Sequence, residues 1–173
     1  AQWAKAIGGS SSDYIKSVTE TSDGGYIAGG YFNSDNIDLE KGVTLKRKSS
    51  YGDDGMLIKY DSIGNAQWAE AIGESGSDEI NSVTPTSDGG VIAGGYFNSD
   101  SMDLGNGITL TRNYYSDGMI IKYDSEGNAE WAKAIQGNNN YDNMIYGDEC
   151  INPITSTSDG GILVGGHFES DNL

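Results

Sequence analysis

The chain has 173 residues, with 26 acidic residues against 10 basic ones and a formal net charge of −16. Such a surface repels phosphate groups, so we expect neither nucleic-acid binding nor membrane insertion. The single cysteine, Cys150, excludes an intramolecular disulfide. With only one histidine, His167, beside it, little material is left for a zinc site or for Ser–His or Cys–His catalysis.

An internal repeat dominates the sequence. The stretch DGMLIKYDSIGNAQWAEAIG at residues 54–73 returns as DGMIIKYDSEGNAEWAKAI at residues 117–135, and its second half opens the chain as AQWAKAIGG. Trp3, Trp68 and Trp131 mark equivalent points, 65 and then 63 residues apart. This period predicts a supersecondary unit of about four strands.

Each unit is expected to hold four antiparallel strands, because Val-, Ile- and Thr-rich runs alternate with Asp-Gly and Gly-Asn turns. The first strand is expected at residues 14–21, 79–86 and 151–157, the second at 26–32, 91–97 and 162–168, the third at 56–61 and 119–124, and the fourth at 66–72 and 129–135, with an extra copy at 1–7. The polar connections at 33–53 and 98–116 are each expected to form a small extra hairpin.

Glycine and proline positions predict how the strands are placed. Glycine pairs at 29–30, 94–95 and 165–166 lie inside the apolar second strand, which indicates tight packing between neighbouring units rather than approach of a ligand. Pro85 and Pro153 fall in the first strand, and proline favours an edge strand. The two prolines occupy different positions within the repeat, so one of them is expected at a strand start or a bulge.

These features predict an all-β chain of β-propeller blades, about three in number and incomplete, with the first strand innermost. A solenoid is the structural alternative. We expect one repeat segment, with a strand at 1–9, a first unit at 10–73, a second at 74–137 and a partial third at 138–173. The segment is expected to belong to a longer array or to associate with further copies of the repeat.

The order SDGG-YIAGGYF, DLGNGITL and SDGMIIKYDSEGNAEWAKAIQG resembles the bacterial SBBP-type β-propeller repeats over nearly the whole chain. The KYD-x-x-GN-x-x-W core is the most specific part of the likeness. The resemblance implies a propeller and a secreted or cell-surface bacterial setting, and it supplies no catalytic residues. The third unit departs from the pattern by eight extra residues between Trp131 and its SDGG turn.

Carboxylates are the only reactive groups in quantity. Those in the hairpin turns, such as Asp23 and Asp61, are interpreted as turn formers. A second set is spaced in oxygen-rich loops and is the candidate Ca²⁺ site, against the alternative of a solvated polar loop. This set comprises Asp35, Asp38, Asp100 and Asp103. It lacks the EF-hand pattern, and no other cofactor is expected.

The insertion GNNNYDNMIYGDEC at residues 137–150 breaks the repeat, and loops on rigid scaffolds often carry function. Its amides and phenols suit a protein or glycan partner, although a tolerated insertion without a role is the alternative. The candidate ligand-binding residues are Asn138, Asn139, Asn140, Tyr141, Asp142 and Tyr146.

The expected function is therefore a non-catalytic extracellular scaffold for adhesion or for protein or carbohydrate binding. The alternative is a propeller-type carbohydrate-active enzyme that uses two carboxylates with separated pKa values. The acidic residues instead recur at equivalent positions, as structural residues would.

Overall fold

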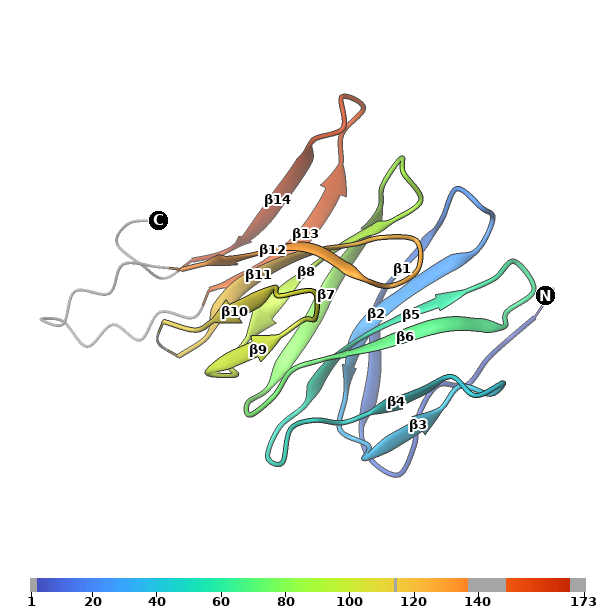
Figure 1. The fold of residues 1–173 in the computed structure, drawn as a ribbon, viewed down its shortest axis with the longest axis horizontal. Coiled ribbons are helices and arrows are strands. Elements are labelled where there is room, and N and C mark those ends of the chain that lie inside the picture. Colours follow the sequence, from blue (N-terminus) through green and yellow to red (C-terminus); the bar gives the residue numbers. More distant parts are fainter. Residues whose placement is uncertain (1–2, 114, 137–148, 169–173) are drawn as a thin grey trace, which may run out of the picture.

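The computed structural model describes residues 3–113, 115–136 and 149–168, which form fourteen β-strands. No helix in this part of the chain is long and apolar enough to cross a membrane. Three units lie side by side, and the first strands of neighbouring units are in contact (Figure 1). The fold is all-β and propeller-like, as the sequence predicts.

Two units are complete four-stranded antiparallel sheets. The first has the order β1 (Asp13–Glu20), β2 (Tyr26–Phe32), β5 (Asp54–Tyr60) and β6 (Ala66–Ile72). The second has the order β7 (Asp78–Pro85), β8 (Val91–Phe97), β11 (Asp117–Tyr123) and β12 (Ala129–Ile135). The described part of the third unit pairs β13 (Cys150–Ser156) with β14 (Ile162–His167).

The connections between the second and third strands form the small hairpins predicted from the sequence. In the first unit β3 (Asn36–Asp38) pairs with β4 (Thr44–Lys46), and in the second β9 (Ser101–Asp103) pairs with β10 (Thr109–Thr111). The first strands β1, β7 and β13 lie at sheet edges, as the prolines predict. Pro153 lies at the irregularity between Ile151 and Ile154, where the register of β13 shifts.

The strand predicted at residues 1–7 is wrong for the part that is described, since residues 3–7 form no strand. A fourth strand needs the free edge of a third strand to pair with. The two third strands, β5 and β11, are already paired on both edges. Trp3 instead packs on the turn between β5 and β6, where its Nε1 donates to the Ser62 carbonyl at 3.2 Å.

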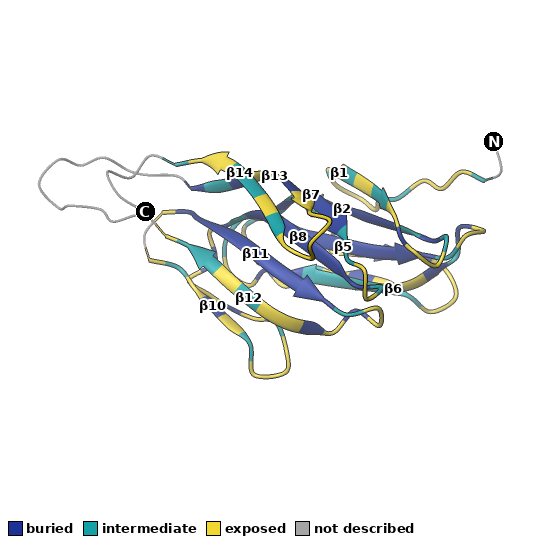
Figure 2. Cartoon of the chain, turned by 90° about the horizontal axis from the view of Figure 1, so that it is seen from above, coloured by how far each residue is buried: buried dark blue, intermediate teal, exposed yellow. Residues whose placement is uncertain are grey.

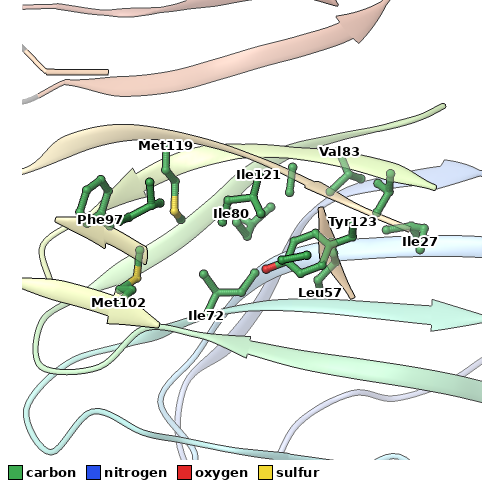
Figure 3. Close-up of a cluster of buried hydrophobic side chains, with 14 residues drawn as sticks. Ile27, Leu57, Ile72, Ile80, Val83, Phe97, Met102, Met119, Ile121 and Tyr123 are labelled. Atoms are coloured by element: carbon green, nitrogen blue, oxygen red, sulfur yellow. The ribbon is translucent and has the colours of Figure 1, made fainter. Parts of the chain in front are cut away.

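The core fills the space between neighbouring sheets. Ile27 and Leu57 of the first sheet meet Ile80 and Val83 of the second in one buried cluster, which continues to Phe97 (Figure 3). A second cluster lies beneath the β3–β4 hairpin and a third joins the second unit to β13. Burial is highest on the middle strands, whereas much of β12 and β14 is exposed (Figure 2).

The interior glycines allow this close approach. A β-carbon at Gly29 would lie 2.7 Å from Val83 Cγ1, and one at Gly94 would lie 2.7 Å from Ile151 Cγ2. Real β-carbons do not approach other atoms so closely. The predicted packing between units is confirmed at these two positions.

Each complete sheet also contains one buried lysine. Lys59 Nζ lies 2.7 Å from Asp23 Oδ1 and also contacts the Thr21 hydroxyl, while Lys122 Nζ lies 3.0 Å from Asp88 Oδ2 and 2.8 Å from Glu130 Oε2. These ammonium groups tie the turn that joins the first and second strands to the third strand of the same sheet.

A tryptophan links each unit to the next. Trp68 Nε1 donates to the Ser125 carbonyl at 3.0 Å, and its indole covers Gly127, which has a φ of 90°. A β-carbon at Gly127 would lie 2.8 Å from Trp68 Cδ2. Trp3 covers Gly64 of the first unit in the same way. Tryptophan and turn therefore form a clasp that recurs with the repeat.

Candidate functional site

The first strands of the three units meet along one polar surface. A cleft of about 530 Å³ opens there, and its lining comes from all three units. It is lined by Lys16, Ser77, Asn81, Tyr96, Asn98, Ser116, Cys150 and Asn152. None of these eight residues carries a carboxylate.

Three of the lining residues occupy equivalent positions on the first strands. Lys16 is on β1, Asn81 on β7 and Asn152 on β13. Lys16 Nζ contacts Glu79 Oε2 and donates to Asn81 Oδ1 at 3.0 Å. Asn81 Nδ2 in turn donates to the Ile151 carbonyl at 3.3 Å. One polar chain thus crosses from the first unit to the third.

Aromatic residues lie beside this polar chain. Lys16 Nζ is 5.0 Å from the centre of the Tyr31 ring, which stacks on Tyr14 at 5.0 Å. At the position equivalent to Tyr31, burial and then the nearby Glu79 raise the pKa of Tyr96. The Tyr96 phenol donates a hydrogen bond to Glu79, and its oxygen can still accept one.

The exposed amides of Asn98 and Asn152, with this phenol and Lys16, offer donors and acceptors for a polar ligand. The cleft is suited to binding by hydrogen bonds and by contact with aromatic rings. We did not predict this cleft from the sequence. One sequence feature could have pointed to it: the position held by Lys16 in the first unit is held by asparagine, Asn81 and Asn152, in the other two.

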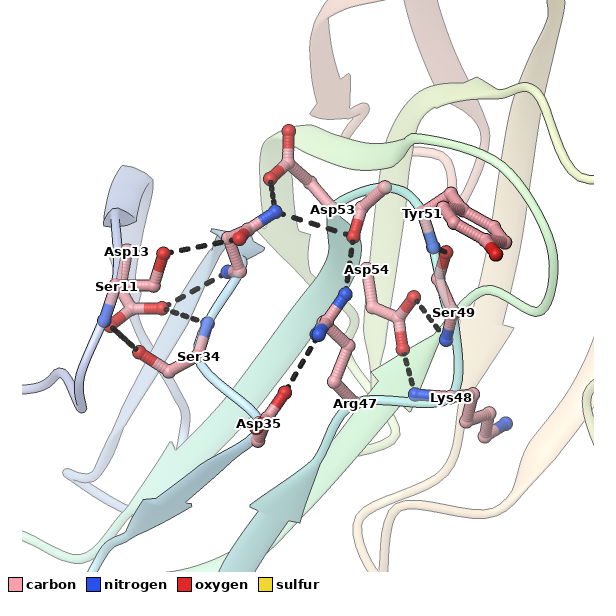
Figure 4. A network of polar contacts seen from close by, with 12 residues as sticks. Ser11, Asp13, Ser34, Asp35, Arg47, Lys48, Ser49, Tyr51, Asp53 and Asp54 are labelled. Atoms are coloured by element: carbon pink, nitrogen blue, oxygen red, sulfur yellow. Dashed lines mark hydrogen bonds and ion pairs between the residues drawn. The ribbon is translucent and has the colours of Figure 1, made fainter.

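The four predicted metal ligands do not converge. Asp35 pairs with Arg47 at 2.7 Å (Figure 4). Asp100 pairs with Arg112 in the equivalent contact of the second unit. Asp38 Oδ1 accepts the Glu40 N–H at 2.9 Å, and Asp103 Oδ1 accepts the Gly105 N–H at 2.9 Å. No group of three or more His, Cys, Asp or Glu side chains with metal-site geometry occurs within the described ranges. The Ca²⁺ site stays a prediction.

The carboxylates that begin the first strands are held by hydrogen bonds. Asp13 Oδ2 accepts a hydrogen bond from the Ser34 hydroxyl at 2.6 Å (Figure 4). Asp78 Oδ2 accepts one from the Ser99 hydroxyl at 2.7 Å. Burial acts to raise the pKa of Asp13, but the hydrogen bonds from Ser34 and from nearby backbone N–H groups outweigh it and leave that pKa lowered.

The predicted turn formers have that role in the structure. Asp61 Oδ1 accepts the Asn65 N–H at 2.8 Å, and Asp124 Oδ1 accepts the Asn128 N–H at 2.9 Å. Asp159 Oδ1 accepts the Gly161 N–H at 3.2 Å. Side-chain hydrogen bonds from Asn65, Asn128 and Thr157, followed by these backbone bonds, lower the pKa of the three carboxyl groups.

Two carboxylates do approach each other, at the junction of the first two units. A β-carbon at Gly73 would lie 2.6 Å from Asp78 Oδ2 and 2.8 Å from Asp54 Oδ1. Both aspartates are fully buried. Burial raises the pKa of both, and the charge of Asp78 adds to the effect on Asp54. A solvent-borne substrate does not reach this pair.

The candidate ligand-binding residues of the insertion lie outside the described part of the chain. They are Asn138, Asn139, Asn140, Tyr141, Asp142 and Tyr146. Their role stays a prediction.

Comparison with known proteins supports a repeat β-structure. No family model matches the chain. The chain is similar to an uncharacterized WD repeat-containing protein of Acanthamoeba polyphaga mimivirus, with 32% identity over 114 residues. The match takes in 63% of this chain and 8% of the relative, so the chain spans only a small part of the relative's length. The resemblance to bacterial SBBP-type repeats is not confirmed beyond this repeat architecture.

The predicted setting has to be corrected. A secreted or cell-surface bacterial location is wrong by this comparison, because the similar protein is viral and nothing found points to secretion or to a bacterial origin. The prediction rested on the SBBP resemblance alone. Repeat geometry is dictated by strand pairing and turn chemistry, which are the same in every compartment.

Proposed function

We propose that the chain is a non-catalytic interaction scaffold that binds a polar segment of a partner protein in the cleft between its first strands. The observation that carries this proposal is the lining of the cleft, to which three units contribute amide, hydroxyl and phenol groups, one ammonium group and one thiol, but no carboxylate. A surface assembled from successive repeats is a usual way for repeat proteins to present a binding site.

The distribution of carboxylates supports binding over catalysis. A glycosidase needs two accessible carboxyl groups on either side of its substrate. The recurring aspartates described here instead accept hydrogen bonds from turns, serines or lysines, and the close pair Asp54 and Asp78 is buried. The named likeness to a WD repeat-containing protein fits a scaffold, although that relative is itself uncharacterized.

The test is a peptide-display screen and a glycan array with the labelled chain, followed by titration of each hit. Asn152→Arg places a large cation in the cleft at an exposed position, and Tyr51→Ala is the matched surface control because Tyr51 is 93% exposed and outside the cleft. We expect a peptide hit that Asn152→Arg weakens about tenfold or more and Tyr51→Ala leaves unchanged, since a displaced polar contact costs about 1.4 kcal/mol or more.

Three results would overturn the proposal. One is a hit that both variants bind equally well. Another is a glycan hit at the cleft without a peptide hit, which would change the partner class. The third is turnover of a bound glycan that is lost on changing a single aspartate, which would establish the enzyme instead.

A further inference from the structure

A second hollow lies at the junction of the two complete units and shares no lining residue with the cleft. Its volume is about 290 Å³, close to the lower end of the range for small-ligand pockets. The lining comes mainly from β6 of the first unit and from the β9–β10 hairpin, β11 and the β11–β12 turn of the second. The polar side chains in it are Lys48, Glu70, Asp103, Asn106, Tyr123 and Asn128. We call this hollow the junction pocket.

Two side chains of the repeat are replaced in the junction pocket. The residues equivalent to Glu70 and Gly105 are Lys5 and Glu40 of the preceding repeat position. Lys5 Nζ pairs with Glu40 Oε2 at 2.6 Å, and Glu40 makes this contact although its φ is 71°, a conformation that disfavours a side chain. Glu70 and Gly105 cannot form such a pair, because glycine has no side chain. The place that an ion pair occupies in one repeat is therefore left to other groups in the next.

Two polar groups of the junction pocket have no hydrogen-bond partner among the residues that the structure describes. One is the carboxyl of Glu70, and the other is the hydroxyl of Tyr123. Tyr123 is 2% exposed, and its ring belongs to the core between the two sheets (Figure 3). Burial raises the pKa of Glu70, and burial followed by the charge of Glu70 raises the pKa of Tyr123. A polar group that is buried without a partner is costly, so a ligand that supplies the partner gains affinity.

The two groups together define what the ligand offers. A carboxylate only accepts hydrogen bonds, whereas a protonated phenol has an O–H to donate. One ligand hydroxyl can donate to Glu70 and accept from Tyr123 at the same time. An ammonium ion has no acceptor for the phenol, and an anion is repelled by the charges of Glu70 and Asp103. The pair is therefore matched by a neutral hydroxyl group.

The rest of the lining suits further hydroxyl groups. Asn106 donates one amide N–H to the Ala129 carbonyl at 3.2 Å, which leaves its Oδ1 and its second N–H for a ligand. Ala71 and Leu104 add apolar surface for the C–H groups of a ligand. We propose that the junction pocket binds a small polyhydroxylated molecule, either a single sugar ring or an acyclic polyol, through the Glu70 carboxyl and the Tyr123 hydroxyl. This site is separate from the cleft, and either proposal can fail without the other.

The test titrates the full chain with a panel of free monosaccharides and acyclic polyols, followed by saturation-transfer NMR and tryptophan fluorescence. Trp68 is a reporter, because it packs on Gly127 of the pocket lining. We expect saturable binding of at least one sugar or polyol. Tyr123→Phe removes only the hydroxyl and should weaken this binding about tenfold. Tyr60→Phe is the matched control and should leave it unchanged, since the equivalent Tyr60 hydroxyl also lacks a partner but is sealed from solvent.

A second variant closes the junction pocket without relying on the phenol. Glu70→Lys combined with Gly105→Glu recreates the pair of Lys5 and Glu40, which the repeat already accommodates, and it should abolish binding. Urea unfolding shows that each variant is folded. A panel without a binder at about 100 mM, a hundred times a weak Kd of about 1 mM, would overturn the proposal. So would binding that Tyr123→Phe leaves unchanged, or binding of methylammonium in place of the polyols, which would make the occupant a cation.

Discussion

Gly29 of β2 lies directly against Val83 of β7, so that a β-carbon on Gly29 would be 2.7 Å from Val83 Cγ1. The same relationship joins Gly94 of β8 to Ile151 of β13. The side chain absent from one unit thus makes room for the branched side chain of the next, and the distance between sheets is set at this contact.

We therefore expect Gly29→Ala to lower the free energy of unfolding by about 1–3 kcal/mol, because overpacking a tight core forces neighbours to move. Gly165→Ala is the matched control, since the nearest atom to its β-carbon would be Pro153 Cδ of the same unit, at 3.2 Å. Chemical denaturation of the three proteins measures the difference. Equal loss in both variants would show that the penalty comes from the strand itself and that the contact between units is not its cause.

The tryptophan clasp predicts a second difference between equivalent residues. Trp68→Ala removes the indole from Gly127 and the hydrogen bond to Ser125, and it should cost about 2 kcal/mol or more. Trp68→Phe keeps most of the ring and should cost about 1 kcal/mol, the usual value of one hydrogen bond.

Trp131→Ala is the control for this series and should change stability little in the isolated chain, because Trp131 is 37% exposed. Thermal and urea unfolding measure all three variants. A loss at Trp131 as large as that at Trp68 would contradict the assignment of the clasp to contacts between units.

The strands could be predicted because they depend on local patterns. The second strand of the second unit was expected at 91–97 and is observed at Val91–Phe97, where an Asp-Gly turn and an apolar run mark both ends. The strand expected at 1–7 failed for the opposite reason. Its sequence matches β6, but a strand also needs a free edge, and pairing is a property of the whole sheet.

The cleft could not be predicted in the same way. Lys16 and Asn81 are 65 residues apart, and Asn81 and Asn152 are 71 residues apart. The three residues meet only when three units pack side by side. Sequence periodicity identified them as first-strand residues but did not show which face of that strand is shared. The burial of Lys59 and Lys122 was likewise not predicted. Burying a lysine is costly unless an acidic group pairs with it, and the sequence does not show which aspartate lies beside each lysine.

Lys59→Met should show what a buried lysine contributes. Lys59 is 5% exposed, and its hydrogen bond to Asp23 is the largest of the contacts that lower the pKa of that carboxyl. A carboxyl with a lowered folded-state pKa stabilises the fold above its unfolded pKa of about 3.9, and this contribution is lost as the pH falls through the folded-state pKa.

We expect Lys59→Met to cost about 1 kcal/mol at neutral pH, a modest value because Asp23 is largely exposed. The difference in unfolding free energy between the variant and the parent should become smaller below a pH of about 4. Lys133→Met, at an exposed position of β12, is the control and should match the parent. Urea unfolding at several pH values measures this difference. A difference that does not depend on pH would show that the lost stability comes from packing of the lysine side chain.

Calcium addition tests the predicted metal ligands. Asp35 and Asp100 are engaged by Arg47 and Arg112, and Asp38 and Asp103 cap their turns, so we expect the same melting temperature in chelator and in about 1 mM Ca²⁺. A saturable increase that Asp100→Asn removes would contradict this expectation and would establish a site there.

Asp78→Asn tests the buried carboxylate pair. Burial raises the pKa of Asp78 in the folded state, so the folded protein binds this proton more tightly than the unfolded chain does. For this group, stability therefore increases as the pH falls from the folded-state pKa toward the unfolded value of about 3.9. Asparagine is never ionised, and its side chain can keep the bonds to Asn98 and Ser99.

The variant should therefore be more stable than the parent at neutral pH, and its advantage should shrink on mild acidification. Asp13→Asn is the matched control, because the folded-state pKa of Asp13 is lowered and its pH dependence has the opposite sign. Urea midpoints between about pH 3 and pH 7 measure both, a range that spans the unfolded carboxyl pKa of about 3.9. An advantage for Asp78→Asn that grows on acidification would show that Asp78 is stabilised as an ion.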